Sequence, residues 1–165
     1  MDFKDELIYA SCKLKAATMS ACTEGEISIA LQSKTVAVVG ISKSRGKPSH
    51  DVAAYMKSHG YRILPINPTA DEILGEKCHR SLLDLPDHLK CQIEVVDIFR
   101  RAEDVPSVVE QAIELRKSCA HQITIRMQLG IVNEQAAGKA RKAGLNVVMD
   151  RCIKVEHERR SGYSS

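Results

Sequence analysis

The chain has 165 residues, enough for one domain with a sizeable hydrophobic core. Its hydrophobic fraction of 44% is ordinary for a globular protein, and two Phe, four Tyr and no Trp leave a core that must be mainly aliphatic. A formal net charge of +3 with so few aromatic residues argues against a nucleic-acid binder, because such proteins concentrate basic charge on one face and often add stacking aromatics.

Residues 1–33 are expected to form a partly helical N-terminal extension. A weak helical pattern covers 6–19, but its apolar residues make no continuous stripe. The stretch GEISIALQS is a better helix candidate, because Ile27, Ala30 and Leu31 share one helical face. We expect a loosely packed segment that adds little to the core.

From Lys34 onward, apolar runs alternate with helical patterns across short connections. The β-branched run TVAVVG indicates a buried strand, and the helix after it is expected to stop at Gly60. A loop with short turns separates the second strand from the third, and a basic tail begins at residue 151. The expected strands are 35–40, 61–67, 93–99, 121–128 and 145–150, and the expected helices are 49–60, 103–118 and 132–144.

This alternation is typical of a parallel sheet with helices on both faces. We therefore predict the α/β class, as a single doubly wound Rossmann-like domain with a five-stranded, mainly parallel sheet. The domain is expected to cover 34–157, between the N-terminal extension and a flexible basic tail at 158–165. In such sheets a ligand binds at the carboxyl ends of the strands, near the point where the strand order reverses.

The loop after the first strand has the features of an anion site. Gly40 permits a sharp backbone turn and a close approach to a ligand. The helix that begins near Ser49 offers unpaired backbone N–H groups and the positive end of its dipole. Three positive charges lie within five residues of the loop, on Lys43, Arg45 and Lys47. These features predict a phosphate-binding corner between the first strand and the first helix.

Two common nucleotide motifs do not fit this loop. The dinucleotide fingerprint needs glycines where Ser42 and Arg45 stand. It also needs an acidic residue at the end of the second strand, where this chain has Asn67 and Pro68. The glycine and lysine pattern of a P-loop is absent. A nicotinamide-dependent oxidoreductase therefore remains only as the least favoured alternative.

The cysteines and the N-terminus favour a reducing, aqueous location. The six cysteines contain no CxxC pair and no zinc-finger spacing, so we expect six free thiols and no metal site. The opening residues MDFKDELIYA are acidic and lack the apolar core of a secretory signal. No apolar run approaches the ~20 residues that span a membrane. We predict a cytoplasmic protein with neither a membrane nor a nucleic acid as partner.

Short motifs farther along the chain match one family in a fixed order. They are INP after the second strand, GEK in the loop, VDIFRR at the third strand, MQLG after the fourth and MDRC after the fifth. With the phosphate corner, they make residues 32–157 closely resemble the stand-alone Rossmann-type CoA-binding proteins. That family is similar to the CoA-binding domain of the succinyl-CoA synthetase alpha subunit. The combination of motifs is specific, although no single one is.

The resemblance implies that the protein binds coenzyme A or an acyl-CoA. One departure from the family is Arg126, which stands where an aromatic residue is frequent. Either the site has no aromatic wall at this edge, or the change alters only surface packing. By position in the motifs, the implied contacts are Gly40, Ile41, Ser42 and Lys43 for the phosphates, Asn67 and Pro68 for the nucleotide, Phe99 and Arg100 beside the ligand, and Gln128, Leu129 and Gly130 along the pantetheine arm.

No residue set in the sequence indicates catalysis. The acyl-CoA synthetase relatives carry their phosphorylated histidine on another domain, and the six histidines here belong to no nucleophile motif. Asp97 is expected to be a hydrogen-bonded structural carboxylate. Cys152, beside Arg151, is either a buried unreactive thiol or a redox thiol that could form a mixed disulfide with CoA. We expect a non-catalytic CoA binder. The alternative is a CoA-binding subunit that completes an acyl-CoA-handling enzyme with a partner chain.

Overall fold

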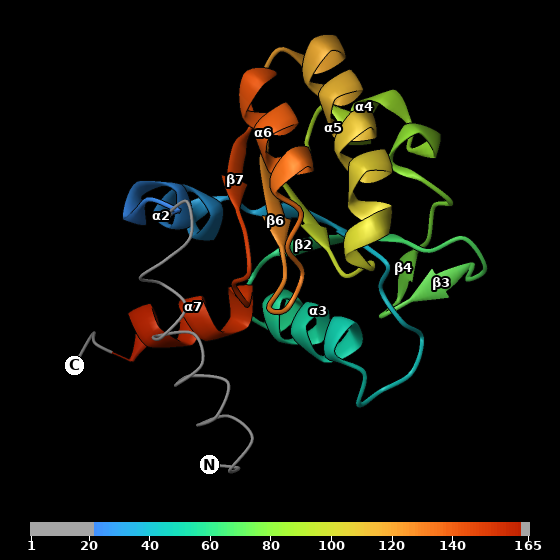
Figure 1. The fold of residues 1–165 in the computed structure, drawn as a ribbon. Helices are drawn as coiled ribbons and strands as arrows, with labels where there is room; N and C mark the ends of the chain where they lie inside the picture. Colours follow the sequence, from blue (N-terminus) through green and yellow to red (C-terminus); the bar gives the residue numbers. More distant parts are fainter. Residues whose placement is uncertain (1–21, 163–165) are drawn as a thin grey trace.

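The computed structural model describes residues 22–162, and the helix expected at 6–19 lies outside them (Figure 1). Five strands form the main sheet: β1 (Thr35–Val39), β2 (Arg62–Ile66), β5 (Val95–Ile98), β6 (Thr124–Met127) and β7 (Asn146–Val148). The helices are α2 (Glu24–Gln32), α3 (Pro48–Ser58), α4 (Asp87–Lys90), α5 (Val105–Cys119), α6 (Glu134–Lys142) and α7 (Ile153–Ser161).

The sheet has the order β2-β1-β5-β6-β7, and every pairing in it is parallel. The chain moves outward from β1 to β2 and then returns past β1 to β5, so the strand order reverses between β1 and β5. Val36 pairs with Ile63 on one side and with Val95 on the other. The predicted Rossmann-like α/β fold with five strands is confirmed. In folds of this kind a ligand is expected at the carboxyl ends of the strands where the order reverses, here β1 and β5.

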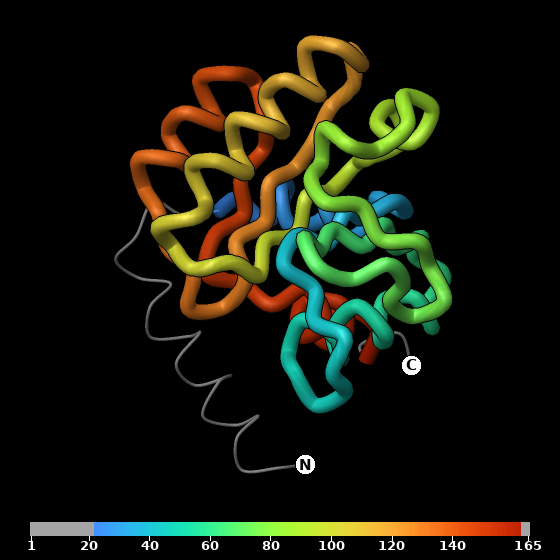
Figure 2. Tube along the Cα trace, turned by 90° about the vertical axis from the view of Figure 1, so that its right-hand side faces the viewer, coloured from blue at the N-terminus to red at the C-terminus, as the bar shows by residue number. Residues whose placement is uncertain are grey.

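Helices cover both faces of the sheet (Figures 1 and 2). On one face, α5 and α6 pack on a core that includes Val96, Ile98 and Ile125. On the other face, α2, α3 and α7 pack on a core that includes Val36, Val38 and Val95. Successive strand residues point to opposite faces, which explains why these β-branched runs are buried on both sides.

The connection from β2 to β5 is mostly irregular, as the sequence predicted. It contains a small antiparallel pair, β3 (Glu72–Ile73) with β4 (Glu76–Lys77), a short 3-10 turn η1 (Leu82–Asp84) and α4. A second 3-10 turn, η2 (Ala102–Asp104), leads into α5. The β4 end of the connection lies along β2, where Ile66 bridges to His79.

Both ends of the described chain pack more closely than the sequence suggested. The N-terminal helix candidate is confirmed as α2, which begins with a Thr23–Glu26 capping box and buries Ile27 and Ala30. Residues Ile153–Ser161 form helix α7, not the basic tail that the sequence predicted. This helix buries Ile153 against the α3 side of the core.

The prediction of six free thiols is wrong, because Cys91 and Cys119 form a disulfide with their Cα atoms 5.1 Å apart. Helix α5 runs antiparallel to β5 and so returns Cys119 to the level of Cys91, although 28 positions separate them in sequence. The free cysteines among the described residues are Cys22, Cys78 and Cys152. Within residues 22–162, no helix is both long and apolar enough to cross a membrane.

Candidate functional site

The loops after β1 and β5 touch where the strand order reverses. Gly40 has a φ of +87°, a conformation that favours glycine. A Cβ atom at this position would lie 2.8 Å from Arg100 Cδ and 2.9 Å from the carbonyl oxygen of Phe99. The Gly40 N–H donates to Ile66 O at 3.0 Å, so the loop is also tied to the end of β2.

The loop from Gly40 to Pro48 is shaped by the first turn of α3. Ser42 N–H donates to the buried hydroxyl of Ser49 at 2.9 Å, and Gly46 N–H donates to Asp51 Oδ1 at 3.0 Å. Pro48 suits the first position of the helix, where its missing N–H costs no hydrogen bond. The Ser49 hydroxyl therefore holds the loop against the start of α3.

The loop presents positive charge to solvent. Lys43, Arg45 and Lys47 are all exposed, and none of the three has an ion-pair partner within the described part of the chain. Asp51 is the acidic group joined to the loop, through its hydrogen bond to Gly46. Three cations against one carboxylate leave a positive patch, which suits a multiply charged anion.

Asn67 joins β2 to the same loop. Its Nδ2 donates to Ile41 O at 2.8 Å, and its Oδ1 accepts from the N–H groups of Thr69 and Ala70 at 2.8 and 2.9 Å. These bonds occupy the side chain, so Asn67 positions Ile41, which is fully buried. Pro68, next along the chain, is exposed beside the site.

Phe99 and Arg100 follow β5 and lie against Gly40. Phe99 is half-buried and packs on the core beneath α3. The Arg100 side chain is 45% exposed, and its Nε lies 3.9 Å from Asp104 Oδ2. That distant contact leaves the guanidinium fork available to a planar anion. The structure thus brings together the predicted residues after β1, β2 and β5.

The predicted residues after β6 divide into two groups. Gln128 is 4% exposed, and its Nε2 donates to Asp97 Oδ1 at 2.6 Å, so its side chain points into the protein. Leu129 is half-buried and Gly130 exposed, with Gly130 N–H donating to Asp150 Oδ1 at 2.6 Å. Of the three residues, Leu129 and Gly130 are accessible at the carboxyl end of β6, whereas Gln128 is buried and donates its hydrogen bond to Asp97.

Asp97 and Arg126 are neighbours in the β5–β6 register and share the face covered by α7. Burial raises the pKa of Asp97 to about 6, although the Arg126 guanidinium and the Gln128 hydrogen bond oppose this shift. The expectation that the Asp97 carboxylate is hydrogen-bonded is confirmed, and the side chain is buried.

The expectation of altered surface packing at Arg126 is wrong, because the residue is fully buried. Its Nη2 donates to Arg151 O at 3.3 Å, while Nε and Nη1 have no hydrogen-bond partner among the described residues. Burial lowers the pKa of Arg126, and the carboxylates of Asp97 and Glu156 oppose this effect. The signal that could have revealed its burial is its place in the apolar run of β6.

Cys152 occupies the position just before the first turn of α7, at the carboxyl end of the sheet. Burial raises the pKa of its thiol, although hydrogen bonds from the N–H groups of Val155 and Lys154 act in the opposite direction. Arg151, expected to stabilise a thiolate, places its Nη1 3.4 Å from Glu156 Oε1. A reactive Cys152 therefore remains a proposal.

Known proteins of two kinds are similar in sequence to this chain. An uncharacterised protein of Bacillus subtilis, YneT, is 40% identical over 136 residues, which cover 82% of this chain and 94% of that protein. The ADP-forming acetate–CoA ligase II of Archaeoglobus fulgidus is 39% identical over 83 residues, about half of this chain but 12% of the ligase. The chain thus corresponds to a small part of the ligase.

A solved structure agrees with these matches. A hypothetical protein from Pyrococcus horikoshii has a TM-score of 0.73 and 38% identity, with 83% of this chain and 91% of that chain covered. The family model described as a CoA binding domain matches residues 34–158, which include every loop of the site described above. The chain belongs to the family of CoA-binding domains.

Proposed function

We propose that this protein binds coenzyme A or an acyl-CoA through the loop after β1, and that it has no catalytic activity of its own. The observation that carries the proposal is the exposed set of Lys43, Arg45 and Lys47, which have no ion-pair partner among residues 22–162. CoA carries a pyrophosphate and a 3′-phosphate, so three cations at a strand-order reversal suit it. Membership of the family supports the same ligand.

The surrounding loops suit the rest of such a ligand. Arg100 offers a planar donor fork beside Gly40, and Pro68 lies exposed at the end of β2, where the nucleotide part would pack. Leu129 and Gly130, two strands from β1, would border the pantetheine arm. Asn67 would act indirectly, by fixing Ile41.

Calorimetric titration with CoA, dephospho-CoA and NADH tests the proposal. CoA should bind and NADH should not. Lys43→Ala and Arg45→Ala should each raise the CoA Kd about 10- to 100-fold, because a charge-assisted hydrogen bond contributes roughly 1.5–3 kcal/mol. A residue that contacts the 3′-phosphate should lose more CoA affinity than dephospho-CoA affinity, and one that contacts the pyrophosphate should lose both equally.

Lys142→Ala is the matched control for these variants. Lys142 is an exposed lysine in the last turn of α6, at the opposite edge of the sheet. Its loss should leave the CoA Kd unchanged. If Lys142→Ala weakens binding as much as Lys43→Ala does, net charge alone governs affinity and the loop is not the site.

A second function is favoured by one observation, the match of half of this chain to acetate–CoA ligases. In that case the chain would be the CoA-binding part of an acyl-CoA-handling enzyme whose other part is a separate chain. A tagged chain would then co-purify with a subunit that confers ATP-dependent acyl-CoA formation. Purification without that activity, together with direct CoA binding, would favour the non-catalytic binder.

The proposal includes a cytoplasmic location. It is supported by the free thiols of Cys22, Cys78 and Cys152, since unpaired cysteines are typical of a reducing compartment. The Cys91–Cys119 disulfide would favour an oxidising compartment if it were permanent. A disulfide that opens and closes with the redox state of its surroundings is compatible with the cytoplasm.

A further inference from the structure

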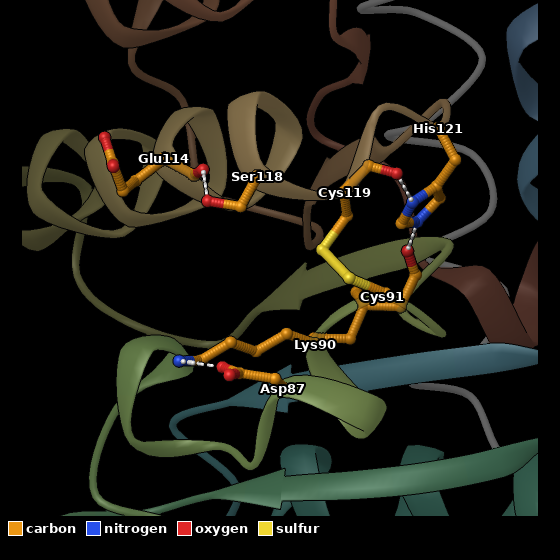
Figure 3. The surroundings of a disulfide bond; sticks show 8 residues. Asp87, Lys90, Cys91, Glu114, Ser118, Cys119 and His121 are labelled. Carbon is orange, nitrogen blue, oxygen red and sulfur yellow. Dashed lines mark hydrogen bonds and ion pairs between the residues drawn. A yellow bond between two sulfur atoms is a disulfide. The ribbon is translucent and has the colours of Figure 1, made fainter.

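Figure 3 shows the Cys91–Cys119 disulfide and the side chains around it. The bond lies before the start of β5, at the amino ends of the strands, whereas the candidate CoA site lies after their carboxyl ends. Cys91 directly follows α4 and precedes β5, whereas Cys119 is the last residue of α5. The seven residues from Ile93 to Phe99 span roughly 20 Å in an extended strand, so the loops of the site are far from the sulfur atoms. The bond therefore joins the start of the β5–α5 unit to its end.

The ring of His121 braces the same corner. Its Nδ1 lies 3.2 Å from Cys119 O, and its Nε2 contacts Ile93 O (Figure 3). The nearby side chains of Lys90 and Asp87 pair with each other at 3.2 Å and leave the disulfide without a direct ionic contact from them. The segment after α4 and the end of α5 are thus joined by the disulfide and by the contact of the His121 imidazole with Ile93 O.

Exposure distinguishes Cys91 from the other described cysteines. Cys91 is exposed and Cys119 half-buried, whereas Cys78 is buried and Cys22 and Cys152 are half-buried. A disulfide breaks when a thiolate attacks one sulfur, so exposure of Cys91 makes the bond open to small thiols. Exposed disulfides are the labile class, and those sealed in a core are the inert class.

We propose that Cys91 and Cys119 form a reversible redox site that sets the stability of the domain and leaves the CoA-binding loops unchanged. The reductant is a small monothiol such as glutathione. Its thiolate attacks one sulfur and forms a mixed disulfide, and the released cysteine takes up a proton. A second glutathione attacks the mixed disulfide and leaves glutathione disulfide. Two electrons pass to the protein, which gains two thiols.

The expected consequence is a shift in thermal stability. The bond joins two residues 28 positions apart, and the segment between them contains all of β5 and runs to the last residue of α5. Loss of such a crosslink in a domain of this size should lower Tm by about 10 °C, because the unfolded chain regains conformational freedom. The native contacts of Gly40, Phe99 and Arg100 do not involve either sulfur, so affinity for CoA should stay within about two-fold.

The test equilibrates the full chain with glutathione at ratios of reduced to oxidised form from about 1:1 to about 1000:1. Alkylation and peptide mapping then count free thiols, while thermal melts and CoA titrations follow each sample. We expect Cys91 and Cys119 to become alkylated together within this range, with the fall in Tm tracking the alkylated fraction. The variant with both Cys91→Ser and Cys119→Ser should melt at the reduced value in every buffer.

Cys78→Ser is the matched control, since it removes a buried free thiol and should retain the redox-dependent shift. A pair that stays oxidised at every ratio would show an inert structural bond and overturn the proposal. A Tm that does not change when both thiols are free would overturn it too. If the double variant fails to fold, the wild-type melts under reducing conditions still decide. The CoA titration is a separate readout, so absence of CoA binding leaves this conclusion standing.

Discussion

Gly40→Ala should weaken CoA binding by displacing the loop while the domain stays folded. The added Cβ would lie 2.8 Å from Arg100 Cδ and 2.9 Å from Phe99 O. The Arg100 side chain is 45% exposed and can move aside. The Phe99 oxygen moves less easily, because it is a backbone atom of a residue whose N–H donates to Val39 O at 2.8 Å in continuation of the sheet. The backbone at residue 40 must therefore shift, and the cationic loop with it.

Two terms set the size of the effect. The positive φ of Gly40 should cost about 1–2 kcal/mol for a residue with a Cβ. The close contact with Phe99 should cost about 1–3 kcal/mol more, as overpacked sites do. The free energy of unfolding should fall by roughly 2–5 kcal/mol, which most domains survive. A shifted loop should raise the Kd for CoA at least about 10-fold, since each 1.4 kcal/mol of lost contact is tenfold.

Gly46→Ala in the same loop separates these terms. Gly46 has a φ of +83°, but an added Cβ would meet nothing within 4 Å. The free energy of unfolding of the Gly46→Ala protein should therefore fall only by the cost of the positive φ, and its affinity for CoA should change little. Calorimetry with CoA and urea unfolding provide the measurements. Wild-type affinity in a folded Gly40→Ala protein, or an equal loss in Gly46→Ala, would refute the placement of the phosphates at Gly40.

Three further predictions concern charge and protonation. Asp51→Asn keeps an acceptor for Gly46 N–H but removes a negative charge from the loop, so the Kd for CoA should fall about 2- to 5-fold in calorimetry. Burial raises the folded-state pKa of Asp97 to about 6, so the folded protein holds this proton more tightly than the unfolded chain. Stability should therefore decrease as pH rises from about 4 to 6, and urea unfolding of Asp97→Asn should lack this component. Under mild oxidation, a CoA adduct should map to Cys152 in preference to Cys22, and it should form faster at pH 9 than at pH 7 because burial raises the pKa of the thiol. An adduct that persists in Cys152→Ser would contradict this.

The sheet and most helices were predictable because their signals are local. In the run TVAVVG every residue after the threonine is apolar or glycine, so polar and apolar side chains do not alternate. A strand that is buried on both faces has this pattern. Pro48 and Pro106 mark the starts of α3 and α5, where a missing N–H is tolerated. The loop at Gly40 followed from the same local order of strand, turn and helix.

The rest depends on contacts between distant segments. The Cys91–Cys119 bond could not be predicted, because the spacing of the cysteines in sequence does not show that the end of α5 lies next to Cys91. Gln128 matched its motif, but its side chain points inward because Asp97 lies on the adjacent strand. Ser49 marks the predicted start of the helix, but only the structure shows that its hydroxyl accepts a hydrogen bond from Ser42 N–H in the loop. A motif identifies where a residue sits in the fold, while its neighbours determine which way its polar atoms point.

The buried charge of Arg126 explains why the C-terminal helix α7 docks on the sheet. Arg126 lies on the sheet face that α7 covers, and its Nη2 finds an acceptor in Arg151 O, at the entrance to that helix. Glu156 is 3% exposed and contacts Arg151 at 3.4 Å and Arg159 at 3.3 Å. An unpaired buried guanidinium is strongly unfavourable, so a segment that supplies a carbonyl and a carboxylate gains stability by docking there. Composition alone predicts a polar basic tail at 151–165. In the structure, Arg151 O accepts a hydrogen bond from Arg126, and the Glu156 carboxylate supplies an opposite charge near its guanidinium. Docking of α7 also places Cys152 at the ligand edge of the sheet.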